Sequence, residues 1–277
     1  MKINILQLIM KEMQNGYSEA NASAKVCQDL VLKALAEGPL SRNVTIKGGV
    51  VMRSRTGNIR RATQDLDIDF IRYSLAEESI DAFVRKLNCI SGITFIRTGS
   101  IDELRQQDYH GKRIYVLIRD TAGNEIKGKI DLGVHRRLEI AQEEYCFDIS
   151  LNEEGASLLI NSFEQMFSEK LRSLLKFGAF STRYKDVFDI YYLIDKIDAR
   201  KLSFCFRSYI FDDPGMKENN MKEVVKRVQM TFQDKVYRRN LEFTDKNWLG
   251  EGIGKIADGI ITCLSSLEDG VGTSGNI

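Results

Sequence analysis

The segment DLDIDF at residues 65–70 carries an aspartate at every second position, with an apolar residue after each one. Because successive side chains of a β-strand point to opposite faces, Asp65, Asp67 and Asp69 would share one face and the apolar residues would be buried on the other. Carboxylates this close repel one another, and a bound divalent cation relieves that repulsion. The sequence therefore predicts a sheet whose acidic face can hold a metal ion.

A glycine pair, Gly48–Gly49, follows a short strand predicted at residues 44–46. Glycines at a strand-to-helix turn allow close backbone approach and leave N–H groups that suit a phosphate. A metal site beside a phosphate site indicates nucleotidyl transfer, in which a metal ion bridges the triphosphate. The alternative is that the aspartates face solvent and the glycines form an ordinary loop.

Asp131 is a further candidate, at the end of a strand predicted at residues 125–132. From a neighbouring strand, its carboxylate would complete a two-metal site or accept the proton of the attacking hydroxyl. The alternative is an aspartate that caps a turn. Asp69 shares the face of Asp65 and Asp67 but lies further along, so we expect it to be the polar exit of the strand rather than a third ligand.

Four arginines precede the carboxylates, in a segment predicted to be a loop: Arg53, Arg55, Arg60 and Arg61. They would either grip phosphates or RNA, or form a solvated run of charge. The residues alone favour neither alternative.

The third group of candidates lies in the C-terminal half. Lys170 falls within a predicted amphipathic helix, and Asp186 and Asp189 share a face of the next one. A lysine here would place positive charge on a triphosphate as pyrophosphate leaves. The alternative is a helical hairpin with ordinary surface salt bridges, in which Glu169 and Arg183 would also take part, and periodicity alone favours it.

Two halves are predicted within the 277 residues, an α/β half at 1–150 and a helical half at 151–277, which makes the fold class α+β. The charge balance of 40 basic to 39 acidic residues gives no polybasic signature. The five cysteines include no Cys-x-x-Cys pair, so we expect reduced thiols in a cytoplasmic protein. No apolar run is long enough for a membrane span, and two histidines are too few for a histidine-based metal site.

Together these motifs resemble the AbiEii/AbiGii toxin family of nucleotidyltransferases, within the DNA polymerase β-like superfamily. The resemblance covers residues 40 to 200 approximately and depends on five segments in order: KGGVVM, RRATQDLDIDF, the strand of Asp131, SEKLRSLL and RYKDVFDIYYL. It implies a small mixed-sheet nucleotidyltransferase core with helices, followed by a helical C-terminal domain. It also reverses the preference for surface salt bridges around Lys170.

Family members act as toxins in abortive-infection or toxin–antitoxin pairs, and some are implied to add nucleotides to the acceptor end of tRNA. The resemblance thus implies Mg²⁺ or Mn²⁺, an NTP substrate, an RNA acceptor and an antitoxin encoded nearby. A small molecule such as an aminoglycoside, or a protein hydroxyl, is the alternative acceptor. A further alternative is an inactive module that only binds nucleotide.

Carried over position by position, the resemblance also implies roles for single residues. Many relatives have a hydroxyl residue after the glycine pair, where this chain has Val50, so backbone N–H groups would bind the phosphate alone. The implied roles are triphosphate binding by Gly48 and Gly49, metal binding by Asp65 and Asp67 with Asp131 as the weaker third ligand, phosphate contact by Lys170, positioning of Lys170 or the acceptor by Asp186, and loop ordering or phosphate contact by Arg61 and Thr63.

Overall fold

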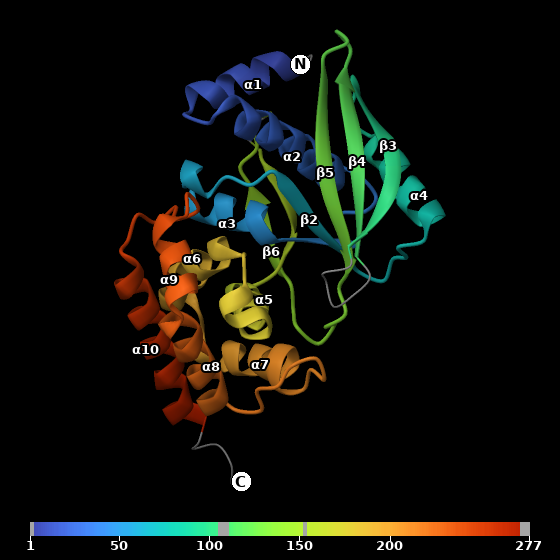
Figure 1. The fold of residues 1–277 in the computed structure, drawn as a ribbon. Helices are drawn as coiled ribbons and strands as arrows, with labels where there is room; N and C mark the ends of the chain where they lie inside the picture. Colours follow the sequence, from blue (N-terminus) through green and yellow to red (C-terminus); the bar gives the residue numbers. More distant parts are fainter. Residues whose placement is uncertain (1–2, 105–110, 152–153, 272–277) are drawn as a thin grey trace. The chain divides into compact units, whose positions relative to one another are not determined.

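The computed structural model describes residues 3–104, 111–151 and 154–271. The chain divides into two compact units, Met1–Asn161 and Ser162–Ile277. The first contains a mixed sheet with helices and the second contains helices, which confirms the predicted α+β class (Figure 1). No helix in the described ranges is long and apolar enough to cross a membrane.

The described part of the first unit forms a seven-stranded sheet in the order β3-β4-β5-β2-β1-β7-β6. β2 is parallel to β5, β1 is parallel to β7, and the other neighbouring strands are antiparallel. The strands span β1 (Val44–Lys47), β2 (Asp65–Phe70), β3 (Ile93–Leu104), β4 (Gly111–Asp120), β5 (Glu125–Val134), β6 (Glu143–Phe147) and β7 (Ala156–Ile160).

Alternation along β2 gives the sheet its two faces, as the sequence predicts. Leu66, Ile68 and Phe70 are buried on the apolar face. The ring of Phe70 packs edge-on against Phe83 of α4 (Glu77–Leu87), with the centroids 5.1 Å apart. The three aspartates of β2 therefore lie on the opposite face.

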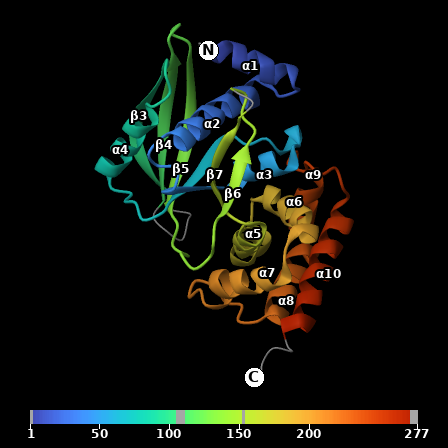
Figure 2. The same cartoon turned by 180° about the vertical axis from the view of Figure 1, so that it is seen from behind.

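The apolar face is also covered by α2 (Glu19–Glu37), which packs against β5 and β7 (Figures 1 and 2). This approach is close at Gly128, where a Cβ would overlap the Sγ of Cys27. The other described helices of this unit are α1 (Ile5–Gln14) and α3 (Gly48–Thr56), and a 3-10 turn follows at Ile59–Arg61.

The last strand of the sheet follows the expected boundary at residue 150. β7 pairs in parallel with β1, Thr45 opposite Leu159 and Ile46 opposite Ile160. Because β1 leads directly into Gly48, this pairing places β7 in the unit that carries the glycine pair. The compact first unit accordingly extends to Asn161.

Helices packed around an apolar core make up the second unit. Ser162 caps its first helix, and its Oγ accepts a hydrogen bond from the backbone N–H of Gln165 at 3.2 Å. α5 packs against α6, α7 and α8, and α10 packs against α6 and α8. The helices span α5 (Phe163–Phe177), α6 (Tyr184–Leu193), α7 (Ala199–Phe206) with a π-helical continuation at Arg207–Phe211, α8 (Met221–Gln233), α9 (Lys235–Phe243) and α10 (Ile253–Val271).

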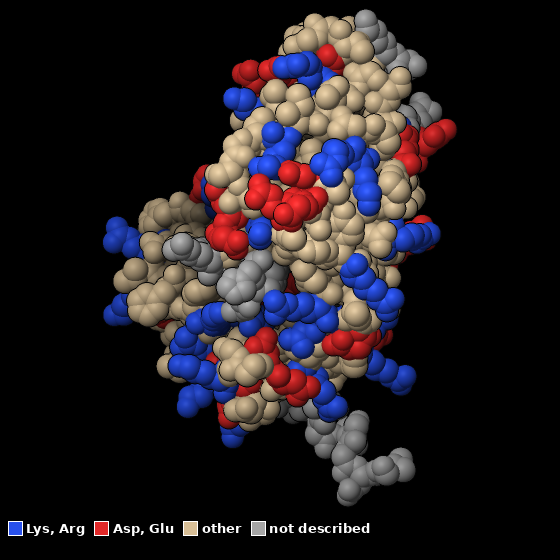
Figure 3. Space-filling model, turned by 90° about the vertical axis from the view of Figure 1, so that its right-hand side faces the viewer, with Lys and Arg blue, Asp and Glu red and all other residues tan. Residues whose placement is uncertain are grey.

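Acidic and basic side chains both occur on the face drawn in Figure 3, as expected from a net charge of +1.

Candidate active site

A row of charged residues crosses four adjacent strands of the sheet. Asp67 on β2 lies opposite Lys47 on β1 and opposite Asp131 on β5, and Asp131 lies opposite Arg113 on β4. Neighbouring strands are about 4.8 Å apart, so side chains on one face at the same level are neighbours. The sheet register thus brings together Asp67 and Asp131, which are far apart in sequence.

Basic partners accompany the carboxylates on this face. Arg113 holds Asp131 through two hydrogen bonds, Nε to Oδ1 at 2.7 Å and NH2 to Oδ2 at 2.8 Å. The hydrogen bond to Asp131 raises the pKa of Arg113, so the guanidinium stays charged. Lys129 Nζ lies 2.9 Å from Asp65 Oδ1, and both of these side chains are about 40% exposed. Neither Arg113 nor Lys129 is identified as a site residue from the sequence. In the sheet, Arg113 lies opposite Asp131 and Lys129 lies opposite Asp65.

Asp69 is buried rather than being the polar exit of the strand, so that expectation is wrong. Its residue exposure is 4%, and its Oδ1 lies 2.9 Å from Lys47 Nζ. Lys47 directly precedes the glycine pair, so this ion pair fixes the end of β1 where the chain turns into α3.

At the start of α3, the glycine pair lies against two residues of the carboxylate motif. Gly48 has φ +67°, and a Cβ there would overlap Asp67 Oδ2 and lie 3.0 Å from Asp67 Cγ. A Cβ on Gly49 would lie 2.6 Å from Thr63 Oγ1. Glycine is therefore required at both positions. Because the first N–H groups of a helix lack intrahelical partners, this turn presents donors beside the Asp67 carboxylate.

The four arginines before β2 differ in exposure: Arg53 and Arg61 are buried, Arg55 is half-buried and Arg60 is exposed. Arg53 belongs to α3, is 5% exposed, and donates to Gln28 Oε1. Arg55 NH2 lies 3.1 Å from Glu143 Oε2 on β6. Arg61 is 3% exposed, whereas Arg60 lies on the surface. The interpretation as a solvated charge run is therefore wrong for Arg53 and Arg61, and the phosphate grip stays a prediction.

A buried glutamine, Gln28 of α2, connects the segments around the glycine pair. Gln28 is not identified as a site residue from the sequence. Its Nε2 donates to the carbonyl oxygens of Thr63 at 2.9 Å and Asp65 at 3.4 Å, while its Oε1 accepts from Arg53. With 2% exposure, it links α2, α3 and the start of β2. A polar residue within the apolar stripe of α2 is the sequence signal that marks such a position.

Carboxylate oxygens of the kind that Asp65 and Asp67 provide are hard ligands, which suit Mg²⁺ or Mn²⁺. Within the described ranges, no group of three or more His, Cys, Asp or Glu residues is arranged to hold a metal ion. Magnesium commonly takes one or two carboxylates and completes its coordination with substrate phosphates and water. Asp65 and Asp67 fit that mode, whereas Asp131 would have to leave Arg113 to become a ligand.

In the second unit, Lys170 lies between two carboxylates. Its Nζ is 2.9 Å from Asp186 Oδ1 and 2.8 Å from Asp189 Oδ2. The side-chain exposures are 9% for Lys170, 9% for Asp186 and 0% for Asp189. The alternative of ordinary surface salt bridges is therefore wrong, because this cluster is buried.

Further contacts fix the two aspartates in place. Arg183 Nε donates to Asp186 Oδ2 at 2.7 Å, and Trp248 Nε1 donates to Asp189 Oδ1 at 3.0 Å. The buried Trp248 thus orients a partner of Lys170. Glu169 has a different neighbour, because it accepts a hydrogen bond from the hydroxyl of Tyr209 at 3.3 Å.

Comparison with protein families matches residues 30–248 to the family described as nucleotidyl transferase AbiEii toxin, type IV toxin–antitoxin system. The match begins in α2 and ends at Trp248, so it contains every site residue of both units named above except Gln28. A comparison with curated proteins found no match.

Proposed function

Because the chain belongs to the AbiEii family of nucleotidyl transferase toxins, we propose that it transfers a nucleotide from an NTP to an acceptor hydroxyl of RNA. tRNA is the expected acceptor, and modification of it is the proposed cause of toxicity. The family is that of a type IV toxin–antitoxin system, which implies an antitoxin partner. The observation that carries the proposal is the contact of the Asp67 carboxylate with Gly48.

The glycine corner supports binding of the triphosphate. The backbone N–H groups at the start of α3 would donate to phosphate oxygens, and the hydroxyl of Thr63 lies beside Gly49. Val50, the next residue of the helix, has no hydroxyl, so the backbone N–H groups would bind the phosphate without a side-chain donor at this position. Gln28 would hold the backbone before β2 in position beside the glycine pair, since it donates hydrogen bonds to the carbonyl oxygens of Thr63 and Asp65.

Asp65 and Asp67 would hold the metal ion through their carboxylate oxygens. A magnesium or manganese ion bound there with the NTP would neutralise triphosphate charge and polarise the α-phosphoryl group. Lys129 lies against Asp65 in an exposed pair. Both side chains can therefore exchange partners when substrate binds, because a partly exposed ion pair is only weakly stabilised.

In the proposed reaction the acceptor oxygen forms a bond to the α-phosphorus, and the bond from that phosphorus to the bridging oxygen breaks, so pyrophosphate leaves. Asp131 is the proposed acceptor of the hydroxyl proton, which requires one of its oxygens to be released by Arg113. Lys170 is proposed to place its charge on the departing phosphates. Asp186 and Asp189 would hold the ammonium group in position for that contact.

The test uses each labelled NTP with magnesium and total RNA. We expect the wild type to label RNA, and Asp67→Asn to label it at least about a thousandfold more slowly, as loss of a few kcal/mol of charge stabilisation implies. Asp148→Asn, a change at an exposed aspartate that follows β6, is the matched control and should leave labelling unchanged. Equal labelling by wild type and Asp67→Asn would refute the assignment.

A further inference from the structure

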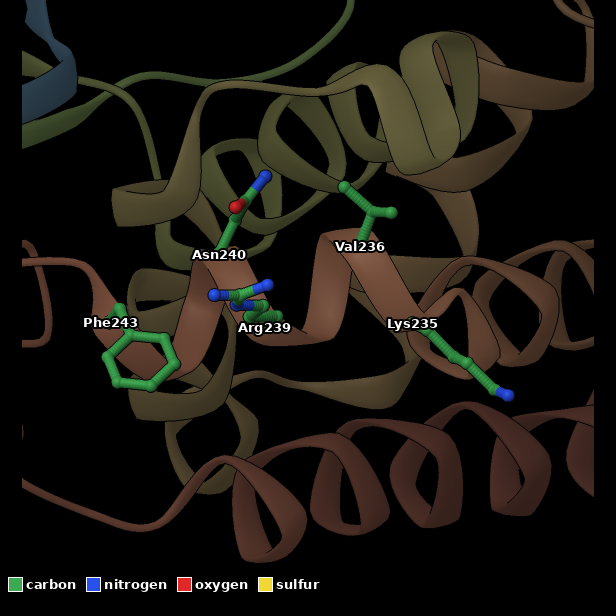
Figure 4. A pocket seen from close by; sticks show the side chains of 5 residues that line it. All are labelled: Lys235, Val236, Arg239, Asn240 and Phe243. Carbon is green, nitrogen blue, oxygen red and sulfur yellow. The ribbon is translucent and has the colours of Figure 1, made fainter.

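One face of α9 in the second unit is exposed and mixes apolar and basic side chains. Val236 is 68% exposed and Phe243 80% exposed, while Tyr237 and Leu241 are buried on the opposite side. Figure 4 shows Phe243 and Lys235 at opposite ends of the helix, with Arg239 and Asn240 between them. Single exposed apolar side chains are common on protein surfaces, but here Val236 and Phe243 share one helix face with two cations, Lys235 and Arg239.

The charges of this face are not neutralised by carboxylates in the part of the chain that the structure describes. Among the described residues, neither Lys235 nor Arg239 makes an ion pair with a carboxylate. Arg238 differs, because its Nε lies 3.4 Å from Glu242 Oε1 and its NH2 group approaches Gly254 at the start of α10. The exposed face therefore carries two positive charges that an external anion can neutralise.

An open hollow of about 500 Å³ runs along this face and is lined by Lys235, Val236, Arg239, Asn240 and Phe243. All of these residues belong to α9, so the hollow has one wall and does not enclose a small ligand, which binds in a concave pocket. Along the helix, Lys235 and Phe243 are about 12 Å apart at 1.5 Å per residue. A wall of this length suits an extended chain laid beside the helix.

We propose that this face of α9 binds single-stranded RNA, and that the RNA it binds is the acceptor in the proposed function, on which this last step rests. Lys235 and Arg239 would contact successive phosphates, and Phe243 would stack on an unpaired base. Asn240 lies between them and can donate to or accept from a base edge. Two cations that pair with no carboxylate among the described residues, and one exposed ring, are the elements of a single-strand site.

The test measures fluorescence polarisation of a labelled single-stranded oligoribonucleotide and of labelled total tRNA. The titrations use the full chain without NTP, so that binding is separated from transfer. Lys235→Gln combined with Arg239→Gln should weaken binding at least about tenfold. The slope of log affinity against log salt should fall by about 1.4, since each single-strand phosphate contact contributes about 0.7.

Arg238→Gln is the matched control, because it removes the same charge from the same helix but from a residue paired with Glu242. It should leave both the affinity and the salt slope near the wild-type values. Phe243→Ala should weaken binding about five- to a hundredfold without changing the slope, since stacking contributes about 1–3 kcal/mol per base. Phe243→Tyr keeps a stacking ring and should restore binding. Unchanged thermal unfolding would show that each variant is folded.

The proposal is overturned if the double variant binds RNA as the wild type does, or if Arg238→Gln weakens binding equally. It is also overturned if the wild type binds neither RNA. Transfer assays separate this failure from failure of the proposed function. If the wild type labels RNA and the α9 variants keep the wild-type KM for RNA, only the α9 proposal fails. If NTP label never enters RNA, the RNA acceptor itself is wrong.

Discussion

The charge clusters of the two units differ in how their charges are paired and in how exposed the pairs are. In the first unit, carboxylates on a sheet face have basic residues beside them, and the Asp65–Lys129 pair is about 40% exposed on both sides. In the second unit, a single lysine lies between carboxylates, and the pair of Lys170 with Asp189 is 9% and 0% exposed. The residues of an exposed ion pair exchange partners easily. Removing one residue of a buried pair instead leaves the other charge buried, with neither a partner nor water to stabilise it.

The two clusters are also held in position by different means, the first by backbone geometry and the second by ion pairs. The first cluster is positioned by backbone, through the strand register and the glycine turn. Its Asp65–Lys129 pair is exposed and available to a ligand, whereas Asp69 is buried against Lys47. The second is positioned by its own ion pairs, so Lys170 contributes to stability as well as to the proposed chemistry. Substitutions of the exposed Asp65–Lys129 pair should therefore affect activity with little loss of stability, and substitutions in the second cluster should affect both.

The largest effect is expected from breaking the buried cluster with Asp189→Ala. This change leaves Lys170 with one carboxylate and Trp248 without its acceptor. Removing one partner of a buried ion pair costs about 3–5 kcal/mol. Urea denaturation should show this loss in the free energy of unfolding. A loss below about 1 kcal/mol would mean that the cluster behaves as a surface pair, and the comparison between the units would fail.

Gly48→Ala should impair the first cluster through sterics. The new methyl group would overlap the Asp67 carboxylate, and alanine at φ +67° is strained by about 1–2 kcal/mol. We expect NTP transfer to fall about a hundredfold or more, with a stability loss no greater than that strain. Gly57→Ala is the control, since Gly57 also has positive φ but has open space around its Cα. Gly57→Ala should lose about as much stability as this strain implies and should keep the wild-type rate of NTP transfer.

Gln28→Met tests whether the glycine corner needs its buried support. The substitution keeps the volume but leaves the Thr63 carbonyl and the Arg53 guanidinium short of a partner. Buried groups without partners cost about 1–3 kcal/mol, and a displaced Asp65 should lower kcat more than it raises KM for NTP. Gln7→Met, on the exposed side of α1, should change neither quantity. Unaltered kinetics in Gln28→Met would remove its positioning role.

The smallest effect is expected from Lys129→Gln. The pair with Asp65 is solvent-exposed, so its loss should change the free energy of unfolding by less than about 1 kcal/mol. Chemical denaturation of this variant beside Asp189→Ala gives the contrast between the clusters directly. A loss as large as that of Asp189→Ala would show that exposure does not distinguish them.

Local patterns in the sequence correctly predicted several elements. Alternation in β2 identified its two faces, because a strand has a period of two, and helical periodicity identified α5 and α6. It did not give the register that places Asp67 opposite Asp131, since pairing of distant strands depends on the whole sheet. β7 was missed because its five residues follow the expected boundary at 150.

Burial was the main property of the site that sequence did not reveal. The spacing of Asp186 and Asp189 predicted a shared face, but it could not show that Lys170 is enclosed between them. Likewise, Arg53 looks like a solvated residue in the sequence, yet it is buried against Gln28. These pairs join residues on different helices, 16 and 25 positions apart in the chain, so the spacing within one helix carries no signal for them.

The central proposal is that Asp67 and the glycine turn at Gly48 bind an NTP together with a metal ion. Equilibrium dialysis of a labelled NTP with and without magnesium tests this proposal most directly. We predict saturable binding to the wild type that requires magnesium and that Asp67→Asn abolishes. Equal NTP affinity of the wild type and Asp67→Asn, or binding that does not change when magnesium is removed, would contradict it.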